Sequence, residues 1–256
     1  MLKASDIFFN AGNKSILRSV SASFQPGKIT MILGPNGSGK TSLLKICSGE
    51  TLHYKGEITI EGKALPSFGT SELAKFRAVL SQQPHLQFPL SVEEVVMMGR
   101  YPFFQFAPTL HDHNVCNETM ELLQVTTLRK RNYLTLSGGE KQRVQFARVL
   151  SQIWGETLQG NRYLLLDEPL NSLDIRFQQE FMVIARTLLN KQTVIVAIIH
   201  DINLALRFGD EFIFMKDGEI AASGGIDIVT PELIKNVFQV NAEITQHSGR
   251  PYLMFI

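Results

Sequence analysis

The chain has 256 residues, 44% of them hydrophobic and 19% charged, so it can build a globular core and does not resemble a disordered chain. A formal net charge of +1 excludes the broad basic surface typical of proteins that bind nucleic acid or anionic membranes. The sequence has two cysteines (Cys47 and Cys116), no signal-peptide core and no apolar stretch long enough to cross a bilayer. It therefore predicts a protein of a reducing cytosol without a membrane span.

Strand-like and helix-like segments alternate along the chain, which predicts an α/β fold with a mostly parallel sheet. Residues 15–27 are typical of a strand and a turn, and residues 28–33 of a buried strand. A glycine-rich turn follows over residues 34–39, and a helix is expected over residues 40–49. Polar and apolar residues alternate over residues 56–62, which indicates an exposed antiparallel strand.

Helical spacing replaces strands between about residues 84 and 150. The apolar positions that carry this spacing are Val92, Val95, Val96, Val115, Met120, Leu122 and Leu123. We therefore expect a single domain over residues 1–256 with an α/β core (residues 1–83 and 155–256). A helical subdomain is expected as an insertion over about residues 84–154.

Strands are expected to return at residues 163–166 and 193–199. Residues 211–222 predict a hairpin around Asp217-Gly218, which is a favoured two-residue turn. No repeat and no flexible linker interrupts this alternation of elements.

Residues 34–41 fit the phosphate-binding pattern G-x-x-x-x-G-K-[ST] and have the strand before it and the helix after it that this pattern requires. Glycines let the backbone N–H groups point at phosphate oxygens, and the helix N-terminus adds positive charge. We expect Lys40 to contact the β- and γ-phosphates and the Thr41 hydroxyl to bind Mg²⁺. The alternative, a glycine-rich surface turn, is disfavoured by both flanks. The residues predicted to bind ATP here are Gly34, Pro35, Asn36, Gly37, Ser38, Gly39, Lys40, Thr41 and Ser42.

Two acidic residues, Asp167 and Glu168, end the apolar strand over residues 163–166. Ligand sites of open parallel sheets lie at this edge, so Asp167 is expected to face the Mg²⁺ and Glu168 to polarise the attacking water. Taken alone, the pair fits a helix N-cap with a first-turn acid equally well. The phosphate loop favours the functional interpretation.

Ser137 and Glu140 form an S-x-x-E capping box before residues 141–150, where Val144, Ala147 and Leu150 share one helical face. A capped helix that starts with two glycines is also an anion site, because a phosphate can approach the bare backbone. Ser137, Gly138, Gly139 and Glu140 are therefore predicted both to start a helix and to bind nucleotide.

The run LSGGE followed by KQR resembles the signature of ABC-type ATPases. Further marks of that family occur in order along essentially the whole chain: Gln82 in VLSQQ, Asp167 and Glu168 in LLLDEP, Ser172-Leu173-Asp174, and His200 in AIIHD. The resemblance implies a P-loop NTPase core with a mostly parallel sheet, an antiparallel β subdomain and an inserted helical subdomain. It also implies a homodimer in which each ATP lies between the phosphate loop of one subunit and the LSGGE helix of the other.

The resemblance assigns a role to each matching position. Gln82 would reach Mg²⁺ or the attacking water, His200 would contact the γ-phosphate, and Asp174 would lie at the dimer junction. Taken alone, a histidine at the end of an apolar strand is more often a core residue. The expected catalytic residues are Glu168, His200, Gln82 and Lys40, and the expected Mg²⁺ ligands are Thr41, Gln82 and Asp167.

Two positions depart from the family pattern. Ala11 stands where an aromatic residue usually stacks on adenine, which leaves Phe8, Phe9 or a loosely held adenine as alternatives. Leu170 replaces the usual threonine of DEPT and removes a hydroxyl near the dimer junction. The cluster at residues 111–113 (His-Asp-His) has metal-ligand side chains but no partner motif, and is interpreted as a polar loop.

Within the family, residues 71–82, 88–102 and 148–154 resemble the ATPases of bacterial metal-chelate importers, above all those of haem importers. The resemblance implies two transmembrane permease subunits, an indirect periplasmic binding protein, and a place on the cytoplasmic face of the inner membrane. Ferric siderophore and cobalamin importers are the alternatives, and the motifs also leave export or lipid transport open. A soluble ABC ATPase acting on ribosomes or DNA is disfavoured by the single cassette, the lack of heptads and the lack of basic surplus.

Overall fold

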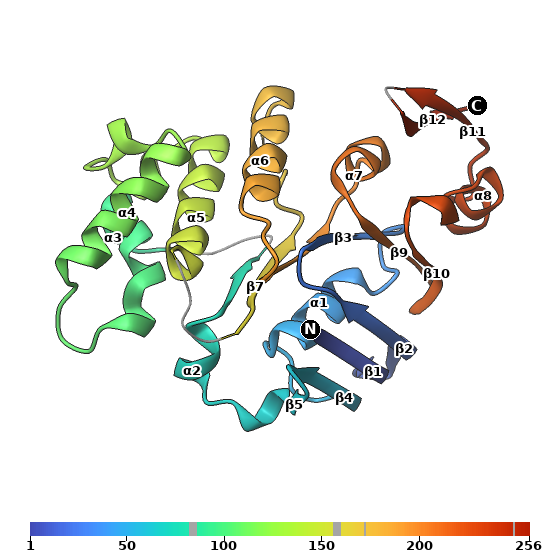
Figure 1. Cartoon of the computed structure of the whole chain (residues 1–256), viewed down its shortest axis with the longest axis horizontal. Helices are drawn as coiled ribbons and strands as arrows, with labels where there is room; N and C mark the ends of the chain where they lie inside the picture. Colours follow the sequence, from blue (N-terminus) through green and yellow to red (C-terminus); the bar gives the residue numbers. More distant parts are fainter. Residues whose placement is uncertain (82–85, 156–159, 172, 248) are drawn as a thin grey trace.

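The computed structural model describes the chain except for residues 82–85, 156–159, 172 and 248. A six-stranded sheet lies at the centre, a four-stranded sheet lies beside it, and a short hairpin lies at the C-terminal end (Figure 1). A group of helices lies at the opposite end of the molecule from this hairpin. None of the helices in the described part of the chain has the length and apolar character that a bilayer crossing requires.

The central sheet has the order β10-β9-β3-β8-β7-β6, in which only β10 runs antiparallel to its neighbour. Its strands are apolar runs because both faces of a parallel sheet are covered. The strands expected at residues 28–33, 163–166 and 193–199 and the hairpin at residues 211–222 are confirmed. The bounds are β3 Lys28–Leu33, β6 Arg77–Leu80, β7 Arg162–Asp167, β8 Thr193–Ile198, β9 Glu211–Lys216 and β10 Glu219–Gly224.

The antiparallel sheet has the order β2-β1-β4-β5, and helix α1 (Lys40–Ser48) packs between it and the central sheet. Leu43, Leu44 and Ile46 of α1 share one apolar cluster with Ile32 of β3 and Leu165 of β7. The strand expected over residues 56–62 is β4 of this sheet. The bounds are β1 Leu2–Ala11, β2 Lys14–Phe24, β4 Lys55–Ile60 and β5 Lys63–Ala64.

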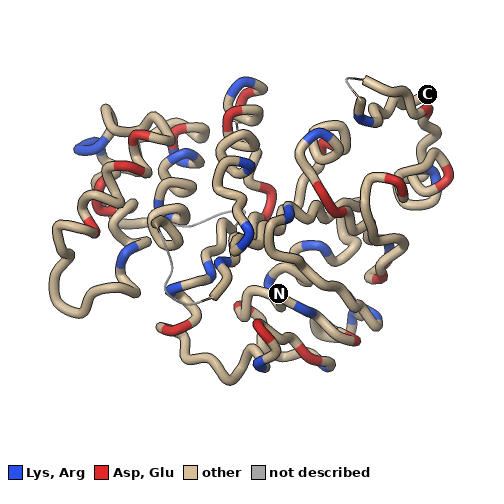
Figure 2. The backbone as a smooth tube through the Cα atoms, in the orientation of Figure 1, with Lys and Arg blue, Asp and Glu red and all other residues tan. Residues whose placement is uncertain are grey.

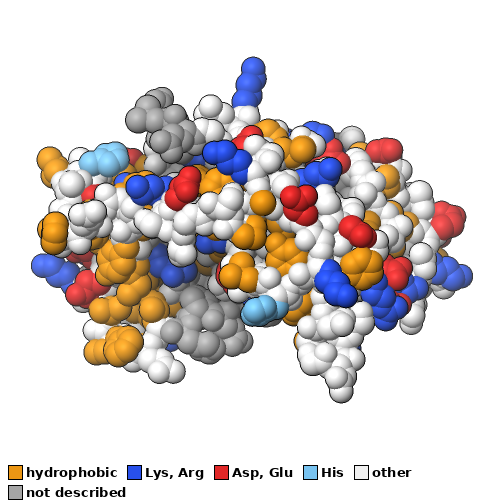
Figure 3. All heavy atoms as spheres, turned by 90° about the horizontal axis from the view of Figure 1, so that it is seen from below, with side chains coloured by type: hydrophobic (Ala, Val, Ile, Leu, Met, Phe, Trp, Pro, Cys, Tyr) orange, Lys and Arg blue, Asp and Glu red, His pale blue; other side chains and the backbone are white. Residues whose placement is uncertain are grey.

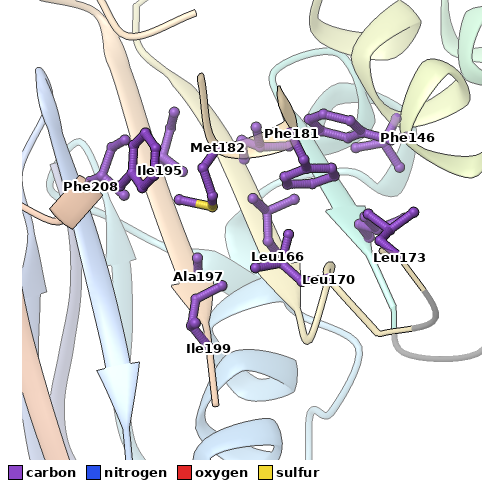
Figure 4. Packing of buried hydrophobic residues seen from close by; sticks show 14 of the residues in the cluster. Phe146, Leu166, Leu170, Leu173, Phe181, Met182, Ile195, Ala197, Ile199 and Phe208 are labelled. Atoms are coloured by element: carbon purple, nitrogen blue, oxygen red, sulfur yellow. The ribbon is translucent and has the colours of Figure 1, made fainter. Parts of the chain in front are cut away.

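Helices α6 (Ile175–Thr187) and α7 (Ile202–Phe208) cover the other face of the central sheet. Side chains alternate along the strands, so Leu166 and Ile195 point to this face while Leu165 points to α1. Phe181 and Met182 of α6 pack over them (Figure 4).

The helical end of the molecule consists mainly of α3 (Val92–Met97), α4 (Leu110–Leu122) and α5 (Gly138–Ile153). Val92, Val95 and Val96, whose spacing predicted a helix, lie in α3 and are fully buried. Short elements complete the chain: the helices α2 (Thr70–Ala74) and α8 (Pro231–Phe238), and five 3₁₀ turns at Leu65–Ser67, Met98–Phe103, Thr126–Leu128, Tyr133–Thr135 and Ile226–Ile228.

The prediction of a polar loop at residues 111–113 is wrong, because these residues form the first turn of α4. Thr109 and Asp112 make a reciprocal capping box that starts the helix. Asp112 is 3% exposed and accepts a hydrogen bond of 2.9 Å from Arg100, which is equally buried. Asp112 is therefore half of a buried ion pair, whereas His111 and His113 are exposed. The described residues contain no group of three or more potential metal ligands.

The C-terminal hairpin, β11 (Ala242–His247) and β12 (Arg250–Phe255), was not predicted. The Asn203 side chain of α7 accepts a hydrogen bond from the backbone N–H of Leu253 and donates one to its carbonyl oxygen. A neighbouring strand would make the same two backbone hydrogen bonds. Acidic and basic residues are interspersed along the described chain, in keeping with the net charge (Figure 2).

Candidate functional site

The loop between β3 and α1 has a backbone that only glycine accommodates at two positions. Gly34 has φ 151° and Gly39 has φ 99°. A Cβ atom at Gly34 would lie 2.2 Å from the carbonyl oxygen of Met215, and one at Gly39 would lie 2.6 Å from Leu17. The residues of the G-x-x-x-x-G-K-[ST] pattern therefore form the tight turn that the sequence predicts, directly before a helix N-terminus.

Lys40 is buried at the centre of this loop. Its ammonium group donates hydrogen bonds to the carbonyl oxygens of Gly34 (2.8 Å) and Pro35 (2.9 Å). Burial lowers the pKa of Lys40, and the carboxylates of Glu168 and Asp167 offset part of that shift. The buried Ser38 hydroxyl beside it has no hydrogen-bond partner among the described residues. A tight glycine-rich loop around a buried ammonium group fits a phosphate group.

Thr41 and Asp167 meet where α1 begins and β7 ends. The Thr41 hydroxyl donates a hydrogen bond of 3.0 Å to Asp167 Oδ1. Asp167 is 2% exposed; burial raises its pKa, the Thr41 hydrogen bond opposes this shift, and the Glu168 carboxylate adds to it. Two hard oxygen donors at one buried point form a donor set that fits Mg²⁺.

Glu168 follows directly and has a left-handed backbone, with φ 50°. Its Oε1 lies 2.7 Å from His200 Nε2, and its Oε2 accepts a hydrogen bond of 2.7 Å from Asn171 Nδ2. His200 follows β8, and its side chain is 45% exposed, so it is not a core histidine. No role was predicted for Asn171, although asparagine is a common turn residue.

The predicted capping box at Ser137 is confirmed. Ser137 accepts a hydrogen bond from the backbone N–H of Glu140, whose carboxylate accepts one from the N–H of Ser137 in return. These hydrogen bonds hold the pKa of Glu140 below its usual value. Ser137 and Gly138 are exposed, and Gly139 is half-buried, so the start of α5 is open to a ligand from outside the subunit.

Helix α5 is also joined to the turn after Glu168. Gln142 Nε2 donates a hydrogen bond of 2.8 Å to the carbonyl oxygen of Pro169. Phe146 of α5 stacks on Phe181 of α6 with ring centroids 3.8 Å apart (Figure 4). The helix that carries LSGGE is thus anchored beside the acidic end of β7.

Three further positions with an expected family role, Asp174, Leu170 and Gln82, lie outside the contacts described so far. Asp174 caps α6 by accepting a hydrogen bond from the N–H of Phe177. Leu170 is 8% exposed and points into the core beside Leu166 (Figure 4). Gln82 and Ser172 lie outside the described residues.

Three residues were considered for the contact with adenine: Ala11, Phe9 and Phe8. Ala11 is exposed at the end of β1. Phe9 pairs with Leu17, the residue beside Gly39, and is half-buried against the α1 cluster. Phe8 is 41% exposed.

Known proteins are similar to this chain in sequence and in fold. The family model described as ABC transporter matches residues 17–171, which is more than half of the chain. The hemin import ATP-binding protein HmuV of Gloeobacter violaceus is 41% identical over 248 residues, covering 96% of this chain and 90% of that protein.

Two solved structures resemble the fold. A metal-chelate type ABC transporter in an inward-facing conformation has a TM-score of 0.81 at 22% identity, over 100% of this chain and 96% of that chain. The dimeric ATP-binding cassette MJ0796, bound to ADP and Pi in a post-hydrolysis state, has a TM-score of 0.74 at 26% identity, over 88% of this chain and 98% of that chain. Together with the phosphate loop, the acidic end of β7 and the LSGGE helix, these matches show that the chain belongs to the ABC transporter family, of which it carries the ATPase domain.

Proposed function

We propose that this protein is the ATP-hydrolysing subunit that powers a bacterial haem importer. The observation that carries the hydrolytic part is the convergence of Lys40, the Thr41–Asp167 contact and the Glu168–His200 pair at one edge of the central sheet. The haem assignment is supported by the relative named for hemin import, which is 41% identical over nearly the whole chain.

The phosphate loop binds ATP. Its backbone N–H groups and Lys40 hold the β- and γ-phosphates, and the orphaned Ser38 hydroxyl gains a phosphate partner. The loop residues proposed to bind ATP are Gly34, Pro35, Asn36, Gly37, Ser38, Gly39, Lys40, Thr41 and Ser42.

Thr41, Asp167 and Gln82 hold Mg²⁺, which neutralises charge on the phosphates when it is bound. Gln82 is proposed on its sequence position alone.

The chemical step transfers the γ-phosphoryl group to water. The water oxygen forms a bond to the γ-phosphorus, the bond from that phosphorus to the bridging oxygen of ADP breaks, and a water proton passes to Glu168 Oε1. His200 leaves Glu168 and holds the γ-phosphate during this step. Glu168 therefore acts as the base, and Lys40 and His200 as the charge-stabilising groups.

One subunit supplies half of each site. Ser137, Gly138, Gly139 and Glu140 start a capped, exposed helix that binds the ATP of a second copy of the chain. The dimeric cassette bound to ADP and Pi supports this arrangement. Asp174 lies at the junction of the two subunits.

The subunit works with two transmembrane permease subunits at the cytoplasmic face of the inner membrane, and indirectly with a periplasmic binding protein. Hydrophobic side chains gather at one end of the face shown in Figure 3, which is the end that carries α3 and α4. The exposed large apolar residues in the described part of residues 84–154 are Phe88, Tyr101, Phe103, Phe106, Leu110 and Leu134. We assign this face, on the helical subdomain of residues 84–154, to the permease contact.

Reconstitution tests the transported compound. The protein is assembled with its permease in proteoliposomes, and uptake and ATP hydrolysis are measured with haem, a ferric siderophore or cobalamin. Haem-dependent stimulation is expected. Stimulation by the siderophore or by cobalamin, with none by haem, would transfer the proposal to that class of importer, and failure of all three would overturn the import assignment.

A further inference from the structure

Both carboxylate oxygens of Glu168 are engaged by side chains of the same subunit. His200 Nε2 lies 2.7 Å from Oε1, and Asn171 Nδ2 donates a hydrogen bond of 2.7 Å to Oε2. The two contacts differ in kind. His200 is an exposed side chain on another strand end, whereas Asn171 lies three residues away in the same turn.

The turn that carries Asn171 is held from several sides. Its left-handed residue, Glu168, costs conformational energy that the surroundings must offset. Gln142 of α5 binds the carbonyl oxygen of Pro169, and the side chain of Leu170 is anchored in the core. The backbone N–H of Asn171 points back to the carbonyl oxygen of Glu168 at 3.4 Å. The Asn171 amide is therefore brought to Glu168 by a backbone with little freedom to move.

We propose that Asn171 is a positioning residue for Glu168, an inference that rests on the proposed function. When His200 moves to the γ-phosphate, it releases Oε1, and Asn171 keeps its hold on Oε2. The carboxylate then keeps its orientation, so that Oε1 is presented to the proton of the attacking water. Orientation of this kind lowers the barrier because the base is held in reacting geometry before the step begins.

If Asn171 only helped to form the turn, the ranking of Asn171→Asp and Asn171→Ala would be opposite to the one expected for a positioning residue. Asparagine and aspartate both favour turns and have the same shape, so a turn-forming role tolerates Asn171→Asp better than Asn171→Ala. A positioning role requires the N–H donor. Aspartate lacks it and places a second carboxylate against Glu168, so Asn171→Asp is then the more damaging change.

The test measures steady-state ATP hydrolysis by the full chain with both variants. We expect kcat to fall about tenfold for Asn171→Ala, in line with the loss of a hydrogen bond to a charged group. It should fall further for Asn171→Asp, and KM for ATP should change less than about twofold in both. The loss of kcat in Asn171→Asp relative to wild type should become smaller as pH is lowered, because the introduced carboxyl, once protonated, can donate a hydrogen bond to Glu168. The loss of kcat in Asn171→Ala should not change with pH in this way.

The controls separate this inference from the proposed function. Asn114→Asp places the same charge at an exposed position of α4 and should leave kcat unchanged. In a Glu168→Gln background, neither Asn171 variant should lower the residual rate further. Normal hydrolysis by Glu168→Gln itself would refute the proposed base. The positioning role alone would be overturned by a different pair of results. Glu168→Gln would be inactive, and the kcat of Asn171→Asp would equal or exceed that of Asn171→Ala.

Discussion

The Thr41 hydroxyl and the Asp167 carboxylate are joined by a hydrogen bond of 3.0 Å across 126 residues of sequence. This contact joins the start of α1, which follows β3, to the end of β7. Strand β8 lies between β3 and β7 in the central sheet. It places the two oxygen donors proposed for Mg²⁺ together in the subunit as it stands. Lys40 is assigned to ATP binding and Glu168 to the hydrolytic step, so substitutions at these two residues should affect different steps of the cycle.

Lys40→Ala should abolish tight ATP binding. The variant loses the buried cation that faces the phosphates, while the fold should persist because the native ammonium group is desolvated. Binding is measured by titration with a fluorescent ATP analogue, and folding by thermal unfolding. Retention of wild-type affinity would show that Lys40 does not bind the phosphates.

Glu168→Gln should bind ATP normally and accumulate as an ATP-loaded dimer. The glutamine keeps the size of the side chain and cannot take the proton of the attacking water. Size-exclusion chromatography with light scattering, with and without ATP and Mg²⁺, measures the dimer. The double variant with Lys40→Ala should remain monomeric under both conditions, and a dimer there would mean that the association is independent of bound nucleotide.

Local patterns were sufficient to predict much of the fold and the outline of the candidate site. The glycine spacing predicted the phosphate loop, and the S-x-x-E pattern predicted the capped start of α5, because each depends on neighbours in sequence. The apolar runs of β3, β7 and β8 were equally clear, since both faces of these strands are buried.

Features that depend on distant contacts were missed or assigned wrongly. Asp112 was taken for part of a polar loop because its partner, Arg100, lies twelve residues earlier and pairs with it only in the folded core. The C-terminal hairpin docks through Asn203, fifty residues before Leu253, and nothing in its own residues indicates that contact. The Asn171–Glu168 hydrogen bond depends on the left-handed backbone of Glu168, which the turn-forming tendency of Asn171 does not predict.

Leu170→Thr should destabilise the protein although it restores the residue usual in related ATPases. Leu170 is buried against Leu166, so threonine would leave a cavity and bury a hydroxyl group. Large-to-small and apolar-to-polar changes of this kind cost about 1–3 kcal/mol at a site that can partly relax. Thermal unfolding measures the loss, and ATP hydrolysis at a permissive temperature should persist. Unchanged or higher stability would mean that the Leu170 side chain does not contribute to the core.

The Arg100–Asp112 pair should make stability depend on pH in acid. Burial alone would raise the pKa of Asp112, but the hydrogen bonds from Thr109 and the Arg100 guanidinium outweigh it and hold the pKa below its usual value. A carboxyl whose folded pKa is depressed contributes its stabilisation in full above the unfolded pKa, near 4. That contribution is lost as pH falls below about 4 towards the folded pKa.

Asp112→Asn should therefore cost about 3 kcal/mol at pH 7, because it leaves the buried Arg100 without its counter-charge. Urea unfolding of the wild type and the variant measures this difference, and the difference should narrow as pH is lowered through 4 and below. Glu121→Gln, at an exposed position of the same helix, serves as the control for loss of a negative charge. A constant difference across the pH range would mean that the ionised form of Asp112 does not stabilise the subdomain.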